Sequence, residues 1–343
     1  MRVNFNINFT MRKTLLFLLI LTFLNCSDKD SSDYDRLEGS AFGTTYHITM
    51  KPGNSMIGER QIDSLIQKVN KSLSTYDPES SISRINRGDT TVILDPYFVE
   101  VFHKSGRIHS DSDGAFDPTI GILVNAWGFG PGPAIPDMDQ QKVDSLMQTV
   151  GFNRLKLKRG KLIKPHPNTY LDFNANAKGY GVDVIGRFLE GRGVKDYLVE
   201  IGGEIRARGL NDKGKPWKVA IEEPNFDGTR SFQAIIELNN ESIATSGNYR
   251  KFKVDSVTGE KYAHTIDPRT GYPSKSKLLS VSVIGSMDCA DADGYATAFM
   301  AMGRLHTEVY LQNHKRMKAY LIFADDDGEI KTFKTSNLEL LEN

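Results

Sequence analysis

The sequence predicts an α+β fold in which helices pack against antiparallel or mixed sheets. Helical and strand periods alternate along residues 38–335, and the later strand-like runs follow one another without regular intervening helices. No internal repeat or low-complexity segment interrupts this range. A doubly wound parallel sheet would need a helix between successive strands, so the pattern disfavours it.

Apolar spacing and capping residues predict three helices in the first half of the chain. Apolar residues recur at helical spacing from Ile62 to Leu73 and form an amphipathic helix. Asp95 and Pro96 supply an N-cap and a first-turn proline for a second helix that continues through Ile108. A third helix fits residues 139–150, with Gly151 as its stop.

Short β-rich runs bounded by Gly, Pro, Asn or Asp predict the strands of the second half. These runs are residues 197–201, 217–221, 232–238, 278–284 and 319–323. The acidic run from Asp325 to Gly328 lies between two strand-like segments and lacks the later ligands of a calcium loop. We therefore expect a hairpin turn there.

Composition and charge place few limits on function. The 343 residues, 39% of them hydrophobic, suffice for a substantial core. Forty-three basic residues balance forty-three acidic ones, so no net field favours nucleic acid or an anionic membrane surface as a partner. We see no linker within residues 38–335 and expect one domain there, followed by a tail at residues 336–343.

The N-terminus has the pattern of an export signal. Arg12 and Lys13 precede an uncharged apolar run, Leu15 to Leu24, which is too short for an ordinary transmembrane span. Cys26 follows, where bacterial lipoproteins carry their lipid-acceptor cysteine. We expect a signal peptide at residues 1–25, lipidation of Cys26 and anchoring to a bacterial membrane, namely the inner membrane facing the periplasm. Simple secretion and an uncleaved anchor are the alternatives.

Residues 27–37 are polar and acidic, so they cannot bury themselves, and we expect them to form a flexible tether. Cys289 is the only cysteine besides Cys26. Once Cys26 is acylated, an exported chain therefore has no internal disulfide, and its stability must come from the core.

Three glycine-rich places could indicate a nucleotide site: residues 128–132, 179–181 and 202–203. None has the G-x-G-x-x-G pattern of a Rossmann site, because Val184 stands where the third glycine belongs. Taken alone, such glycines are mostly turns, and otherwise they mark a close approach of the backbone to a ligand.

Residues 172–179 place a carboxylate and an ammonium at a predicted junction between a strand start at 170–171 and a helix. Helix N-termini attract phosphate, and a lysine such as Lys178 suits a pyrophosphate. The alternative is that Asp172 only caps the helix and Lys178 is solvated.

His264 precedes two turn signals, Asp267-Pro268 and Gly271-Tyr272-Pro273, in a segment that also holds hydroxyl side chains and an arginine. The ordinary pKa of histidine lies near working pH, which makes His264 a candidate general base. A lone histidine is, however, usually a surface residue or a hydrogen-bonded core residue.

Asp293 and Thr297 stand four residues apart in a segment with helical apolar spacing. Positions i and i+4 share one helix face, so a carboxylate and a hydroxyl can present oxygen to one small hard cation. This spacing is also common by chance.

Together these segments resemble the ApbE family of FAD:protein FMN transferases, in order from about residue 38 to residue 303. Eight blocks carry the resemblance: residues 43–46, 74–76 with 81–86, 114–119 with 127–130, 172–181, 201–204, 244–249, 264–273 and 292–297. Eight blocks in order are far more specific than any one of them, and they outweigh the alternative interpretations of the separate motifs.

The resemblance implies a T-fold-like α+β catalytic domain with FAD in a groove between mixed sheets and packed helices, and Mg²⁺ beside the pyrophosphate. The residues that it implies for FAD contact are Phe42, Tyr76, Ala115, Phe116, Asp117, Asp172 and Lys178. Phe42 replaces the methionine usual in the family and can still pack against a flat ring. The implied Mg²⁺ ligands are Asp293, Thr297 and the carbonyl of Ala175, and His264 is the implied catalytic base.

The implied reaction is Mg²⁺-dependent transfer of FMN from FAD to a Thr or Ser hydroxyl of an acceptor flavoprotein, with release of AMP. In this family the acceptor is typically a subunit of a membrane redox complex or an exported flavoprotein. One alternative is a Mg²⁺-dependent FAD pyrophosphatase that gives FMN and AMP. Another is a lipoprotein that only binds FAD, against which His264, Asp293 and Thr297 argue, because storage needs no general base.

Overall fold

The computed structural model describes residues 33–342 except 225–228, 230, 249–251 and 255–260. The expected signal peptide, Cys26 and most of the expected tether lie outside the described residues. Among the helices in the described part of the chain, none is long and apolar enough to span a bilayer.

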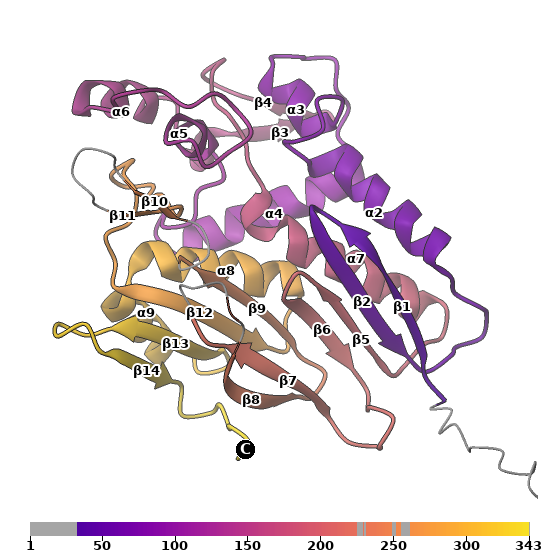
Figure 1. The fold of residues 1–343 in the computed structure, drawn as a ribbon. Coiled ribbons are helices and arrows are strands. Elements are labelled where there is room, and N and C mark those ends of the chain that lie inside the picture. Colours follow the sequence, from indigo (N-terminus) through magenta and orange to yellow (C-terminus); the bar gives the residue numbers. More distant parts are fainter. Residues whose placement is uncertain (1–32, 225–228, 230, 249–251, 255–260, 343) are drawn as a thin grey trace, which may run out of the picture.

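Within the described residues, one eight-stranded sheet organises the fold (Figure 1). Its strands lie in the order β1-β2-β5-β6-β9-β12-β13-β14, and each neighbouring pair is antiparallel. Their bounds are β1 Asp35–Ala41, β2 Thr44–Met50, β5 Tyr197–Ile201, β6 Glu204–Arg208, β9 Ser242–Gly247, β12 Leu278–Gly285, β13 Lys318–Ala324 and β14 Ile330–Lys334. The sheet is thus antiparallel rather than mixed.

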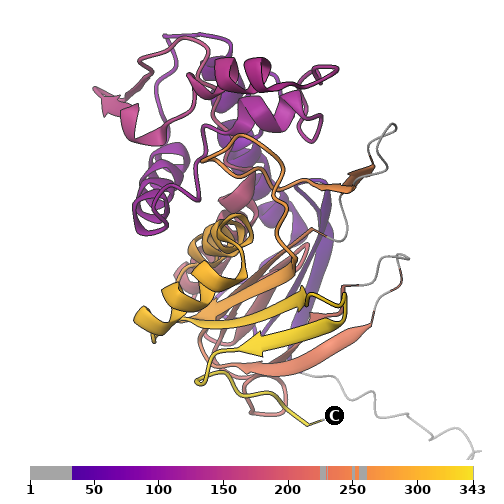
Figure 2. The same ribbon diagram turned by 90° about the vertical axis from the view of Figure 1, so that its left-hand side faces the viewer.

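Helices cover one face of this sheet, and α7 and α8 lie directly on it with α4 beyond them (Figures 1 and 2). The helix bounds are α2 Glu59–Leu73, α3 Ser81–Asn86, α4 Pro96–Asp111, α5 Gly121–Ala126, α6 Gln140–Met147, η1 Phe152–Arg154, α7 Asn174–Gly191, α8 Cys289–Met302 and α9 Arg304–Asn313. Buried residues of α8 occur on all its sides, as expected for a helix enclosed between a sheet and other helices.

The central strand β12 is buried on both faces, because its side chains alternate between the two faces and each face is covered. On β12, Val281 and Val283 pack with α8, whereas Ile284 packs with the strand pair formed by residues 217–222 and 232–238. The two-stranded pairs are β3 Lys156–Lys158 with β4 Lys161–Ile163, β7 Trp217–Glu222 with β8 Phe232–Leu238, and β10 Phe252–Val254 with β11 Lys261–Ala263.

Most predicted elements are confirmed within a few residues at their ends. Asp95 caps α4, because its Oδ1 accepts a hydrogen bond from the Phe98 amide at 3.0 Å. The turn at residues 325–328 joins the antiparallel strands β13 and β14, as expected. Helix α6 ends at Met147, before the predicted end at residue 150.

Three expectations about segment boundaries are wrong. No strand forms at residues 170–171, directly before α7, because Tyr170 makes only an isolated bridge with Ile120. Residues 35–37, expected in the tether, belong to β1, where they pair with β2. Residues 336–342 do not form a free tail, since Leu338 is buried and the Leu341 amide donates to the carbonyl of Ile235 at 2.8 Å.

Candidate active site

The candidate site lies where α7 and α8 pack closely side by side. Gly179 permits this approach, because a Cβ there would stand 2.5 Å from the carbonyl oxygen of Cys289. The Gly179 amide donates to Asp293 Oδ2 at 3.0 Å, so the contact also orients the carboxylate of Asp293. Only the packing of the two helices brings these residues together.

The three oxygen donors implied for Mg²⁺ lie on facing parts of these helices. Thr297 Oγ1 is 3.5 Å from the carbonyl oxygen of Ala175 and 3.1 Å from Ser246 Oγ on β9. Asp293 lies one helical turn before Thr297 and is buried. The two helices therefore present a carboxylate, a hydroxyl and a carbonyl to one small region.

This donor set suits a hard cation. Mg²⁺ prefers oxygen ligands and usually keeps several waters, so it needs few protein ligands. Among the described residues, no group of three or more His, Cys, Asp or Glu side chains gathers as a metal site. The residues present thus fit Mg²⁺ better than they fit Zn²⁺, which takes nitrogen and sulfur ligands.

Glu204 is a site residue that the sequence reasoning did not single out. The Gly202–Gly203 turn, in which both residues have positive φ, places it at the start of β6. Its Oε1 lies 2.6 Å from Lys178 Nζ, and its buried Oε2 has no hydrogen-bond partner among the described residues. Residues 201–204 matched a family block, but only the fold places Glu204 beside Lys178.

Burial and mutual charge shift the pKa values of this cluster. Burial raises the pKa of Glu204 to about 8, with Lys178 acting against the shift and Asp293 adding to it. Burial also raises the pKa of Asp293 to about 6, opposed by Lys178 and by the Gly179 amide. Burial by itself would lower the pKa of Lys178, but Glu204 and Asp293 together leave it raised. Lys178 is therefore a firmly held cation.

These shifts predict that the metal-free protein loses stability as pH rises. A carboxyl group whose pKa is raised in the folded state stabilises the fold fully below its unfolded pKa, here 4.5 for Glu204 and 3.8 for Asp293. The contribution is lost as pH rises through the folded values of about 8 and about 6. We expect the Tm to fall by ~5 °C between about pH 5 and pH 8 in thermal scans.

The variant Glu204→Gln isolates one part of this effect, because an amide does not titrate. The decrease in Tm across the same pH interval should be clearly smaller in that variant. An equal decrease in both proteins would show that Glu204 is not the group responsible.

The loop from Ala115 to Asp117 is held rigidly beside the end of α4. Asp117 Oδ1 accepts from the Thr119 amide at 2.7 Å and from the Thr119 hydroxyl at 2.6 Å, and its Oδ2 accepts from the Phe152 amide at 3.1 Å. The side chains of Ala115, Phe116 and Asp117 are all buried. The carboxylate of Asp117 therefore holds this loop in place.

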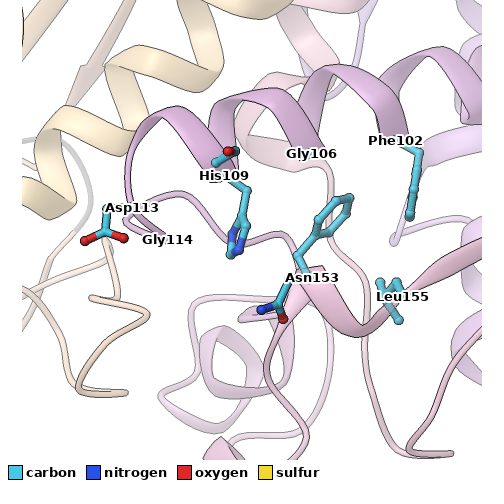
Figure 3. Close-up of a pocket in the computed structure, with 9 residues that line it drawn as sticks. Phe102, Gly106, His109, Asp113, Gly114, Asn153 and Leu155 are labelled. Atoms are coloured by element: carbon cyan, nitrogen blue, oxygen red, sulfur yellow. The ribbon is translucent and has the colours of Figure 1, made fainter.

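A cavity of about 440 Å³ lies beside this loop, between α4 and η1. In Figure 3, His109 and Asn153 approach it from opposite walls. His109 Nδ1 lies 2.9 Å from the Phe116 carbonyl oxygen, and since a carbonyl only accepts, that nitrogen carries a proton. None of the site residues predicted from the sequence lines the cavity, so it is adjacent to the candidate site and separate from it.

Asp172 joins the same region from the start of α7. Its amide donates to the Pro118 carbonyl at 2.8 Å, and its Oδ1 accepts from the Asn174 amide at 2.8 Å. The carboxylate therefore does satisfy an amide at the helix start, as the simpler interpretation expected. Burial raises its pKa, with the Asn174 hydrogen bonds acting against the shift.

The two aromatic residues expected near the flavin differ in exposure. Phe42 lies in the turn between β1 and β2 with φ 51°, and it packs against α7, where a Cβ on Gly181 would stand 2.2 Å from its ring. Tyr76 is 65% exposed, and its pKa is raised by partial burial and then by the charge of Asp172. Tyr76 therefore offers an accessible ring beside the N-terminus of α7.

His264 is half-buried in the segment that follows β11, outside the α7–α8 contact. A bridge between Ile266 and Pro273 closes the turn after it, and the Thr265 hydroxyl donates to Asn248 Oδ1 at 2.8 Å. The His264 ring centroid is 6.5 Å from that of Phe129. The His264 ring therefore lies near the glycine-rich segment around residue 129.

Arg269, from the same segment as His264, is engaged within the protein. Its Nε lies 2.9 Å from Asp267 Oδ1, and its Nη2 donates to the Ala301 carbonyl at 3.3 Å. This second contact connects the segment to the end of α8. Arg269 therefore holds the segment in place.

Comparisons with known proteins agree with this arrangement. A model of the ApbE family matches residues 42–321. The FAD:protein FMN transferase of Vibrio cholerae serotype O1 is 37% identical over 341 residues, covering 96% of this chain and 98% of that protein. The enzyme of the same name from Haemophilus influenzae is 34% identical over 320 residues, covering 89% of this chain and 91% of that protein.

A solved structure, the flavin transferase ApbE from Vibrio cholerae, has a similar fold. It superposes with a TM-score of 0.77 at 35% identity and covers 88% of this chain and 97% of that one. The α+β fold class predicted from the sequence is confirmed. The chain belongs to the ApbE family.

Proposed function

We propose that this protein transfers the FMN half of FAD to a Thr or Ser hydroxyl of an acceptor protein and releases AMP. The observation that carries the proposal is the convergence of Lys178, Asp293, Thr297 and the Ala175 carbonyl at the α7–α8 contact. Similarity to proteins named FAD:protein FMN transferase supplies the flavin specificity.

The residues of the chain have distinct roles in this reaction. Lys178, held by Glu204, offsets the negative charge of the FAD pyrophosphate. Asp293, Thr297 and the Ala175 carbonyl would hold Mg²⁺, which supplies Lewis-acid stabilisation of phosphate charge. His264 takes the proton of the acceptor hydroxyl, whose oxygen forms the new bond to the FMN-side phosphorus. The bond to the bridging oxygen breaks, and AMP leaves with that oxygen.

Transfer and hydrolysis use the same groups and differ only in the nucleophile. The test combines the protein, FAD, Mg²⁺ and a candidate acceptor, followed by a denaturing gel viewed for flavin fluorescence. A fluorescent acceptor band supports transfer. Free FMN with no labelled protein, for every acceptor tried, would favour the FAD pyrophosphatase alternative. Recovery of intact FAD with every acceptor would favour the alternative that the protein only binds FAD.

We further propose that the chain is exported and held on a bacterial membrane, facing the periplasm, by lipid on Cys26. The apolar run before Cys26 supports this proposal. Acyl chains anchor a protein by burying methylenes at about 0.8 kcal/mol each. In cells fed labelled palmitate, Cys26→Ser should lose the label. A labelled variant would contradict lipidation at Cys26.

A further inference from the structure

The first turn of α8 is capped by a carboxylate from a different helix. Asp288, the N-cap residue, makes no side-chain hydrogen bond to the α8 amides. Asp183 of α7 accepts instead, with Oδ1 from the Cys289 amide and Oδ2 from the Ala290 amide, both at 2.9 Å. The first amides of a helix have no partner within it, so Asp183 satisfies two of them and joins α7 to α8.

A buried arginine fixes Asp183 in this position. Arg206 Nη1, from β6, lies 2.9 Å from Asp183 Oδ1 and 2.9 Å from Asp288 Oδ1. Asp183 is fully buried and Arg206 nearly so. Removing one member of a buried ion pair leaves an uncompensated charge, so these positions are strongly constrained.

The same cluster connects the surrounding elements. Asp288 also contacts Lys104 Nζ of α4 at 2.6 Å and Arg187 Nη2 of α7 at 2.9 Å. The beginning of α8 is therefore held from α4, α7 and β6 together. Its position relative to α7 is set by directional contacts in addition to apolar packing.

The candidate metal site depends on that relative position. Ala175 belongs to α7, whereas Asp293 and Thr297 belong to α8 (Figure 1 shows the two helices side by side). Asp183 lies eight residues after Ala175, roughly 12 Å along a helix that rises 1.5 Å per residue. If α7 moves relative to α8 at Asp183, the distance between the Ala175 carbonyl oxygen and the oxygens of Asp293 and Thr297 therefore changes as well.

We propose that Asp183 is a positioning residue for the Mg²⁺ site. It fixes the spacing between α7 and α8 and thereby sets the affinity of the site for the cation. It acts through the helices and contacts neither the cation nor FAD. The inference rests on the proposed function, because that proposal places Mg²⁺ between these helices. Groups that orient metal ligands typically change metal affinity by about 10–100-fold when they are altered.

The test measures Mn²⁺ binding to the full-length protein by loss of the free-ion paramagnetic resonance signal, with and without FAD. Asp183→Asn should weaken Mn²⁺ binding by at least about 10-fold, because an amide cannot accept from both α8 amides and pair with Arg206. The matched control is Glu190→Gln. It removes the negative charge of the group that lies 3.0 Å from Arg206 Nη2, in a contact that does not involve α8, and Mn²⁺ affinity should stay within about 2-fold.

A second variant guards against simple unfolding of the first. Gly179→Ala forces the helices apart at Cys289 without changing any charge, and it should weaken Mn²⁺ binding in the same direction. Near-ultraviolet circular dichroism verifies that each variant is folded. The proposal is overturned if folded Asp183→Asn binds Mn²⁺ with wild-type affinity. If Asp183→Asn does not fold, wild-type Mn²⁺ affinity in Gly179→Ala overturns it. Absence of Mn²⁺ binding by the wild-type protein would instead overturn the metal site itself.

Discussion

His264→Ala is expected to slow FMN transfer by about 10²–10⁴-fold while FAD still binds, because general-base catalysis contributes about that much. The residue belongs to neither α7 nor α8, and its segment is held by its own turn and by Asn248, so its loss leaves the oxygen donors in place. The measurements are the single-turnover transfer rate and the Kd for FAD.

Two controls separate proton transfer from damage to the fold. His47→Ala removes a largely exposed histidine on β2 and should leave the transfer rate unchanged. Added imidazole should restore part of the activity of His264→Ala, because a small base can occupy the space left by the ring. A variant that transfers FMN at the wild-type rate would remove His264 from the mechanism.

Asp293→Ala is expected to abolish Mg²⁺-dependent transfer, with a loss of about 10³-fold or more, because it deletes the one carboxylate of the proposed ligand set. On the flavin-fluorescence gel the acceptor band should go dark. Burial raises the pKa of Asp293 to about 6, so without a metal the ionised carboxylate destabilises the folded state at neutral pH. Without metal, the Tm of Asp293→Ala should therefore be close to that of the wild-type protein. A nearly unchanged Tm would show that the loss of transfer comes from the missing ligand and not from unfolding.

Asp291→Ala is the matched control for Asp293→Ala. Asp291 belongs to the same helix and is also buried, but its ion-pair partners are Lys104 and Arg107 of α4. It should keep Mg²⁺-dependent transfer within about 10-fold of wild type, because residues two apart in a helix do not face the same side and the carboxylate of Asp293 remains. Equal losses in the two variants would indicate a general effect of disturbing α8 and would count against Asp293 as a ligand.

Local patterns account for much of the fold. Apolar spacing and the Asp95–Pro96 cap placed α4 correctly, and β-rich runs between turn residues placed β5 and β8 at their observed bounds. These predictions worked because capping and period-2 alternation act within a few residues. The expected strand before Asp172 failed for the complementary reason: two apolar residues do not form a strand without a neighbour to pair with, and Tyr170 has only the bridge to Ile120.

Residue types and family blocks were enough to nominate Lys178, Asp293 and Thr297 for phosphate and Mg²⁺ chemistry. Their proximity, and the partners that hold them, came only from the packing of α7 on α8. No local pattern pairs Glu204 with Lys178, or Asp183 with the amides of α8, because these contacts join segments far apart in the chain. The sequence by itself determined which chemical groups are available, since that depends on side-chain identity and short-range order. Tertiary structure decided which of them share a site and how their pKa values shift, because burial and charge act through space.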